Sequence, residues 1–252
     1  MRSPLPSKIG TTATCNSSSS LRRRYSRIVA APPASATSRS PAAARARSSA
    51  ASAPSVTKWK VVADEEDAQG IINQTVQQLG RIDFLINNAA SARGEDRVPV
   101  VDLDLDAWDL VIRVKLRGGF LMSRAFAREL IKNEREGAIV NISSIAGKRM
   151  GPNSGAYSAS NAGIQALSSS MSGELGPKGI RVNTICPGVI DTSRLDDLGR
   201  DKRWQAVIQG VPMRRASDGS DIANMAVYLC SEQGNWINGQ AINVDGGSMT
   251  SH

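Results

Sequence analysis

A serine hydroxyl and a tyrosine hydroxyl, two groups able to hydrogen-bond a polar substrate, lie thirteen residues apart in the segment 141–161. The apolar run before them predicts a buried strand that delivers Ser144 to its carboxyl end. The next segment predicts a helix that brings Tyr157 back to the same place. Because open α/β sheets bind ligands beyond the carboxyl ends of their strands, the sequence predicts a ligand site here.

The segment 141–161 resembles the signature of the short-chain dehydrogenase/reductase family, in which a serine precedes Tyr-x-x-x-Lys. The resemblance implies that Ser144 polarises a substrate carbonyl and that Tyr157 is the general acid/base of hydride transfer. The family reaction moves a hydride between NAD(P)(H) and a ketone or secondary alcohol. NAD or NADP is therefore the implied cofactor, and a small carbonyl compound or alcohol is the implied substrate.

Further motifs stand in the order of the same family between residues 61 and 248. They are Asn87-Asn88-Ala89, Cys186-Pro187-Gly188 with Thr192, Gly239, and Asp245-Gly246-Gly247. The resemblance implies that the asparagines tie their loop to the sheet and that the Pro-Gly loop binds the nicotinamide. The implied cofactor-binding residues are Asn87, Ala89, Pro187, Gly188, Val189, Ile190 and Thr192. Ala90 replaces a family glycine, and we interpret that position as requiring only a small side chain.

Two catalytic positions depart from the family pattern. The expected lysine four residues after Tyr157 is Asn161, and the expected asparagine in a preceding long helix is Lys115. The family lysine holds the nicotinamide ribose and its charge favours the tyrosine phenolate, so alcohol oxidation should suffer most from its loss. One hypothesis is that Lys115 supplies the missing ammonium. The alternative is independent loss at both positions in a chain no longer selected for catalysis.

The glycine-rich phosphate fingerprint of the family, Gly-x-x-x-Gly-x-Gly, is missing from residues 1–80, which contain only Gly10, Gly70 and Gly80. No glycine-rich turn is therefore available to bring backbone N–H groups onto a pyrophosphate. Asp64 lies 23 residues before Asn87, too close for the family's adenine ligand, and we interpret it as a helix cap. Without the family's first strands, the strand at 82–86 is an exposed apolar edge unless another segment or chain covers it.

Charge divides the chain into a leader and a folded part. Residues 1–60 hold eight Arg, three Lys and no acidic residue, so this segment contributes +11 and residues 61–252 contribute −3 to the net charge of +8. We interpret residues 1–57 as a Ser/Ala/Arg-rich organelle transit peptide and residues 58–252 as a partial Rossmann-like domain. Ile28 to Ala31 resembles a plastid processing site, whereas Arg24-Tyr25-Ser26 resembles a mitochondrial one. The composition favours the plastid, and neither a membrane span nor a nucleic-acid surface is expected.

The periodicity of the folded part predicts an α/β fold. Short apolar strands alternate with helices of ten or more residues, which indicates a Rossmann-like, doubly wound parallel sheet that is N-terminally truncated. Strands are expected at 59–62, 82–86, 138–143, 181–186 and 241–244. Helices are expected at 64–79, 107–133, 156–175 and 221–230. Residues 193–215 occupy the place of the family's substrate lid.

The family resemblance also implies an oligomer, homomeric or heteromeric, through the helices at 107–133 and 156–175. Apolar residues of the first helix either build that interface or pack on the chain's own sheet: Phe120, Leu121, Phe126 and Leu130. The three cysteines have no zinc or disulfide spacing, and the only histidine is His252. Two functions remain open: an oxidoreductase with impaired activity, or a non-catalytic subunit that pairs with an intact paralogue.

Overall fold

A parallel sheet of five strands, in the order β1-β2-β3-β4-β5, forms the centre of the computed structural model, which describes residues 29–30, 64–91, 94–192 and 202–250. The strands are β1 (Val29–Ala30), β2 (Phe84–Asn87), β3 (Gly137–Ile142), β4 (Ile180–Pro187) and β5 (Ala241–Val244). The predicted α/β class is thereby confirmed, and the four strands expected at 82–86, 138–143, 181–186 and 241–244 are present with ends shifted by up to two residues.

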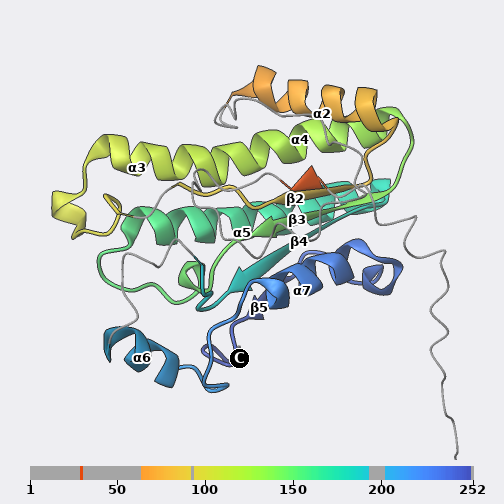
Figure 1. Ribbon diagram of the computed structural model, residues 1–252. Coiled ribbons are helices and arrows are strands. Elements are labelled where there is room, and N and C mark those ends of the chain that lie inside the picture. The colour runs from red at the N-terminus through yellow and green to blue at the C-terminus, as the bar shows by residue number, and fades with distance from the viewer. Residues whose placement is uncertain (1–28, 31–63, 92–93, 193–201, 251–252) are drawn as a thin grey trace, which may run out of the picture.

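Helices cover both faces of this sheet, as Figure 1 shows. On one face lie α2 (Glu65–Leu79), α4 (Gly118–Lys132) and α5 (Gly155–Leu175), and α7 (Ser220–Cys230) lies on the other. Each face has its own buried apolar cluster, the first around Phe126 and Ile139 and the second around Ile185 and Leu229. Shorter elements are α3 (Leu105–Ile112), α6 (Lys202–Gln209), η2 (Val100–Asp102), η3 (Arg113–Arg117), η4 (Ile145–Gly147), η5 (Gly176–Lys178) and η7 (Glu232–Gly234).

Local sequence signals explain where α2 begins and ends. The Asp64 side chain accepts a hydrogen bond from Glu66 N at 3.1 Å, which confirms its interpretation as the helix cap. Gly80 has a φ of +77° and donates its N–H to Val76 O at 2.8 Å, the left-handed ending that glycine favours. Ala90 is absent from the residues with positive φ, so this position does not need glycine for backbone conformation.

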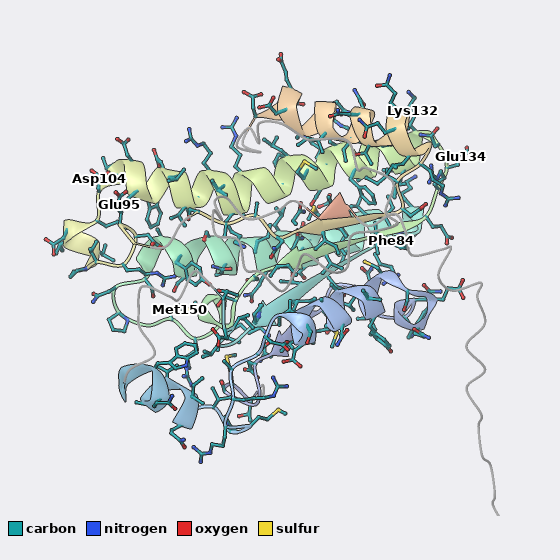
Figure 2. The ribbon with its side chains drawn as sticks, in the orientation of Figure 1. Phe84, Glu95, Asp104, Lys132, Glu134 and Met150 are labelled. Atoms are coloured by element: carbon teal, nitrogen blue, oxygen red, sulfur yellow. The ribbon has the colours of Figure 1, made fainter. Side chains whose placement is uncertain are left out.

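The long helix predicted at 107–133 is interrupted at its centre. Asp104 caps the start of α3 by accepting hydrogen bonds from Asp106 N and Ala107 N, and Figure 2 shows it at one end of the molecule. The π-helical segment η3 then joins α3 to α4 without a break in direction. Lys115 is its central residue. Single π turns often occur at functional sites, so this irregularity draws attention to the lysine.

The outer edge of β2 has a partner. Val29 pairs with Leu85 and Ala30 with Ile86, so a segment of the leader covers two residues of the edge that the sequence left open. The other residues of the proposed transit peptide, and the strand expected at 59–62, lie outside the described residues. Residues 193–201, the first part of the predicted lid segment 193–215, also lie outside the described residues. The described part of that segment contains α6.

The apolar residues of α4 pack mainly on the chain's own sheet. Leu121, Phe126 and Leu130 belong to the first buried cluster, whereas Phe120 is 39% exposed. The simpler of the two interpretations is thus correct for three of these four side chains. Within the described ranges, no helix combines the length and apolarity needed to cross a membrane.

Candidate active site

The carboxyl end of β3 is tied to α5 through Ser143. The Ser143 hydroxyl donates to Asn161 O at 3.0 Å and accepts from Gln165 Nε2 at 2.8 Å, and Gln165 Nε2 also donates to Ser144 O at 3.1 Å. A side chain on Gly147 would place its Cβ 2.8 Å from Ala162 N, so only glycine allows this approach. These contacts bring the serine segment against the helix that carries Tyr157.

Ser144 itself is 8% exposed and begins η4, where its Oγ accepts a hydrogen bond from Ala146 N at 3.1 Å. Its hydroxyl hydrogen is the donor that remains for a substrate oxygen. The strand end that carries Ser144 is thus bonded to α5, the helix that also carries Tyr157.

Tyr157 lies in the first turn of α5 and is half-buried. The guanidinium carbon of Arg97 lies 4.0 Å from the centre of its ring. Sequence reasoning missed Arg97, because it stands in a loop without periodicity or a family motif, sixty positions before the tyrosine. A contact of this kind leaves no signal in a single sequence.

Asn161 turns back onto its own helix. It is fully buried, and its Nδ2 donates to Tyr157 O, one helical turn earlier, at 2.8 Å. Its Oδ1 is buried without a hydrogen-bond partner among the described residues. The position therefore provides a neutral amide that binds backbone, where the family pattern has a long cationic side chain.

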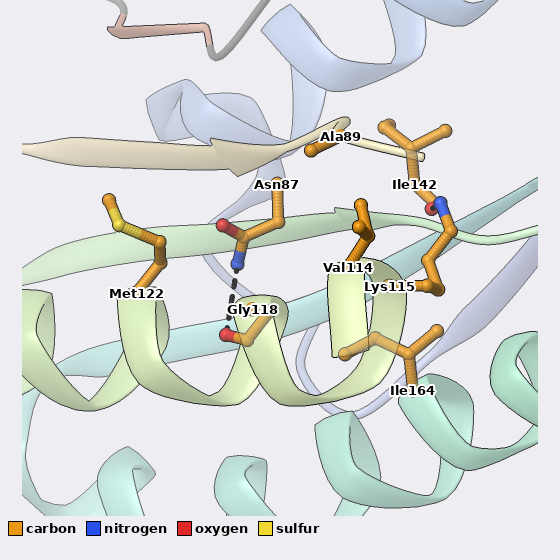
Figure 3. Close-up of a pocket in the computed structure, with 9 residues that line it drawn as sticks. Asn87, Ala89, Val114, Lys115, Gly118, Met122, Ile142 and Ile164 are labelled. Carbon is orange, nitrogen blue, oxygen red and sulfur yellow. Dashed lines mark hydrogen bonds between the residues drawn. The ribbon is translucent and has the colours of Figure 1, made fainter. Parts of the chain in front are cut away.

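Lys115 is 9% exposed, and its Nζ donates to Ile142 O, the last carbonyl of β3, at 2.8 Å. Figure 3 shows the lysine reaching this carbonyl along a small cavity that Asn87 and Ala89 also line. The helix segment around Lys115 lies close to α5, because a Cβ on Gly163 would approach Leu116 within 2.9 Å. The structure thus places one buried ammonium group immediately before the Ser143–Ser144 pair.

Asn87 connects three elements of the site. Its Nδ2 donates to Asn141 Oδ1 at 2.8 Å and to Ser123 Oγ at 3.0 Å. A longer contact with Gly119 O, at 3.5 Å, is the dashed line in Figure 3. Asn141 in turn donates to Ser168 Oγ on α5 at 2.8 Å. The expected tie between the loop after β2 and the sheet is therefore formed through Asn87.

The Pro187–Gly188 turn places the next residues at the carboxyl end of β4. A Cβ on Gly188 would lie 2.7 Å from Asp245 Cβ, so β4 and β5 can approach here only with glycine. Val189 O accepts from Ser217 N at 2.9 Å, the bridge of Ile190 to Ser217 continues this pairing, and Thr192 is exposed. A cavity of about 300 Å³ opens beside Val189 and Asp245, next to the ion pair of Arg215 and Asp221 at 2.7 Å.

The described residues fit one end of a nicotinamide dinucleotide better than the other. The Pro-Gly loop offers backbone groups and a cavity for the nicotinamide end. The helix that follows β1, α2, has its N-terminus capped by Asp64 and followed by Glu65, Glu66 and Asp67. Because this concentration of carboxylates repels an anion, the described residues do not fit the pyrophosphate.

Neither cysteine of the described chain is a candidate nucleophile. Cys186 and Cys230 are free and buried, and burial raises the pKa of each thiol to about 11. Nearby Lys148 and Arg181 respectively oppose this shift without cancelling it. The thiols therefore stay protonated and unreactive at neutral pH.

The parallel sheet with helices on both faces places the chain in the class of Rossmann-like α/β proteins. A family model described as enoyl-(acyl carrier protein) reductase matches residues 34–249. The chain is 33% identical over 186 residues to the 3-oxoacyl-[acyl-carrier-protein] reductase FabG of Thermotoga maritima, covering 74% of each protein. It is 36% identical over 180 residues to the uncharacterized oxidoreductase YohF of Escherichia coli, covering 71% of this chain and 69% of YohF.

A solved structure with the same fold is a short chain dehydrogenase from Bacillus anthracis. Its TM-score is 0.67 at 34% sequence identity, and the match covers 77% of this chain and 75% of that one. The chain therefore belongs to the short-chain dehydrogenase/reductase family of oxidoreductases.

Proposed function

We propose that the chain is an NAD(P)(H)-dependent oxidoreductase of impaired activity that interconverts a ketone and a secondary alcohol. The observation that carries the proposal is the attachment of the Ser143–Ser144 strand end to α5, beside the first turn that holds Tyr157. Two hydroxyls supplied from two elements to one sheet edge can both address the oxygen of a single substrate.

Each hydroxyl has its own part in the reaction. The Tyr157 phenol gives its proton to the substrate oxygen during reduction, and the phenolate takes it back during oxidation. The Ser144 hydroxyl donates a hydrogen bond to the same oxygen and stabilises the charge that develops on it. A bound nicotinamide would supply or accept the hydride.

Lys115 takes the electrostatic part of the lysine that Asn161 has replaced. Its ammonium donates a hydrogen bond to Ile142 O at the end of β3. The neighbouring Leu116 packs against Gly163 of α5, two residues after Asn161. A buried charge interacts strongly with its surroundings because little water screens it. It does not hold the nicotinamide ribose from this position, and the impaired activity follows from that loss.

The names of the relatives suggest a first substrate to assay. Several of them are 3-oxoacyl-[acyl-carrier-protein] reductases, among them the Thermotoga maritima and Chlamydia muridarum proteins. A 3-oxoacyl thioester carries the ketone that the two hydroxyls would address, so it is the substrate class we assign to the reduction.

A second candidate is a non-catalytic subunit that pairs with an intact paralogue. Two observations favour it: the described residues do not fit the pyrophosphate, and apolar side chains of the long helix are exposed. Leu105 is 77%, Phe120 39% and Ile131 42% exposed. A partner chain covering these side chains would remove apolar surface from water.

Cofactor binding separates the two candidates. Thermal unfolding of the full chain should be measured without ligand, with NADPH and with NADH. A cofactor at about 100 times its Kd adds about 2.7 kcal/mol to the free energy of unfolding, which raises Tm by several degrees. A rise in Tm together with reduction of a 3-oxoacyl thioester supports the enzyme, whereas neither effect with either cofactor contradicts it and favours the subunit.

A further inference from the structure

We propose that Arg97 is a positioning residue for Tyr157: it fixes the tyrosine ring and supplies beside it a positive charge that the tyrosine helix lacks. The inference deepens the proposed function, since it rests on Tyr157 being the group that exchanges the proton. It does not require that the cofactor be known.

The contact itself is close and partly shielded from water. The Arg97 guanidinium carbon lies 4.0 Å from the ring centre of Tyr157, well inside the range in which a cation is attracted to an aromatic face. The Arg97 side chain is 25% exposed and its Nε is buried, so the guanidinium is partly desolvated. Such a cation stabilises the ring electrostatically, and it stabilises the negatively charged phenolate more than the neutral phenol.

A tight turn determines the position of the guanidinium. Arg97 N donates to Gly94 O at 2.9 Å, and Asp96 Oδ1 accepts from Gly94 N at 3.2 Å. Asp96 is 3% exposed, and its Oδ2 lies 3.4 Å from Arg97 Nε. Figure 2 shows the intervening Glu95 toward the same end of the molecule as Asp104, the cap of α3. The loop thus holds Arg97 through its backbone on one side and a buried carboxylate on the other.

Two other cations near this site donate hydrogen bonds to strand residues. Lys115 Nζ donates to Ile142 O, and Lys148 Nζ donates to Ala241 O at 2.6 Å and Asn243 Oδ1 at 2.7 Å. Asn161 contributes no charge. Among the described residues, the cation contact on the Tyr157 ring face is therefore that of the Arg97 guanidinium, and the Asp96 carboxylate is paired with this guanidinium.

This arrangement predicts opposite effects for the two charges. Removing the guanidinium with Arg97→Met should disfavour the phenolate, whereas Asp96→Asn should favour it by leaving the guanidinium uncompensated. The amide introduced by Asp96→Asn would keep an oxygen that can accept from Gly94 N, so the turn is preserved. If Arg97 had only a structural role, both variants would loosen the loop, and their effects on the phenolate would not have opposite signs.

The test is a titration of the Tyr157 phenolate by its ultraviolet absorbance in the full chain. The chain has three tyrosines, so the difference between each variant and the same variant carrying Tyr157→Phe isolates the Tyr157 signal. Arg97→Met should move the titration midpoint up, because the variant lacks the cation that stabilises the phenolate. Asp96→Asn should move it down, and Arg97→Lys should restore most of the wild-type midpoint.

Circular dichroism at each pH confirms that the variants remain folded through the titration. Unchanged midpoints in Arg97→Met and Asp96→Asn, or shifts of the same sign, overturn the inference. The readout needs no cofactor or turnover, so a chain without activity refutes the proposed function and leaves this result standing.

Discussion

Two parts of the sheet differ in how extensively their strands pair and are buried. We call the part formed by β3 and β4 the complete side, and the edge formed by β2 and β1 the thin side. β3 and β4 pair over six residues and are mostly buried, whereas β2 has one buried residue, Leu85, and its outer edge is covered by two residues. The complete side carries Ser144, Tyr157 and the Pro-Gly loop. On the thin side, the carboxylates at the start of α2 do not fit a pyrophosphate. The difference teaches that the residues proposed for proton exchange and the start of α2, which does not fit a phosphate, belong to separate parts of the sheet.

The largest expected effect lies on the complete side. Tyr157→Phe removes the group that exchanges the proton and should lower kcat/KM by about 10²–10⁴-fold in 3-oxoacyl thioester reduction. Tm should change little, because the ring and its contact with Arg97 remain. Tyr228→Phe on α7, where the side chain is 43% exposed, is the matched control and should keep full activity. Equal activity of the two variants would remove Tyr157 from the mechanism.

Lys115→Met tests whether the buried ammonium serves the site. Ile142 O loses its donor, which should cost about 1–3 kcal/mol of unfolding free energy in urea, and activity should fall about tenfold or more. Lys132→Met on the exposed end of α4 is the control for loss of a lysine charge. If Lys115→Met lowers stability but not activity, Lys115 is only structural and the exchange with Asn161 is not compensatory.

Gly188→Ala probes the junction of β4 and β5. The added Cβ would lie 2.7 Å from Asp245 Cβ, so the backbone must shift, at a cost of about 1–3 kcal/mol in urea unfolding. Gly173→Ala in α5 meets nothing within 4 Å and should instead stabilise the helix by about 0.5–1 kcal/mol. The same sign for both variants would mean that this junction is looser than its geometry indicates.

The smallest effect on stability is expected at Asp83, immediately before β2 on the thin side. Burial raises the pKa of Asp83, but hydrogen bonds from Arg81 and Arg135 outweigh it, so that the pKa is lowered overall. A lowered folded-state pKa stabilises the protein above the unfolded value of about 4, and this stabilisation is lost as the pH falls below it. Asp83→Asn should therefore cost under about 1 kcal/mol at neutral pH. The difference from wild type should shrink in urea unfolding below about pH 4, and a difference independent of pH would contradict the ion-pair account.

Residues with strong local signals allowed most of the fold to be predicted. Asp64 and Gly80 delimit α2 through the hydrogen bonds and backbone angles that these residue types favour. The serine and tyrosine were placed together because alternating strands and helices return the chain to one edge of a sheet. These signals act within a few residues or follow from the topology of the fold class.

Other features depend on contacts that one sequence does not record. Arg97 contacts Tyr157 across sixty positions, and the Asn161 side chain donates a hydrogen bond to Tyr157 O of its own helix. The π turn around Lys115 changes the hydrogen bonding of a helix without changing its apolar pattern. Two residues at Val29–Ala30 are too few to show the alternation of a strand.

The pairing of β1 with β2 has a consequence for the order in which the protein opens. Val29 and Leu85 are 56 positions apart, so closing the loop between them costs much chain entropy, and only two residue pairs offset it. β1 should therefore detach in brief local openings long before β3 and β4 separate. During each opening the backbone amides and carbonyls along the outer side of β2 meet solvent, or the extended segment of another molecule.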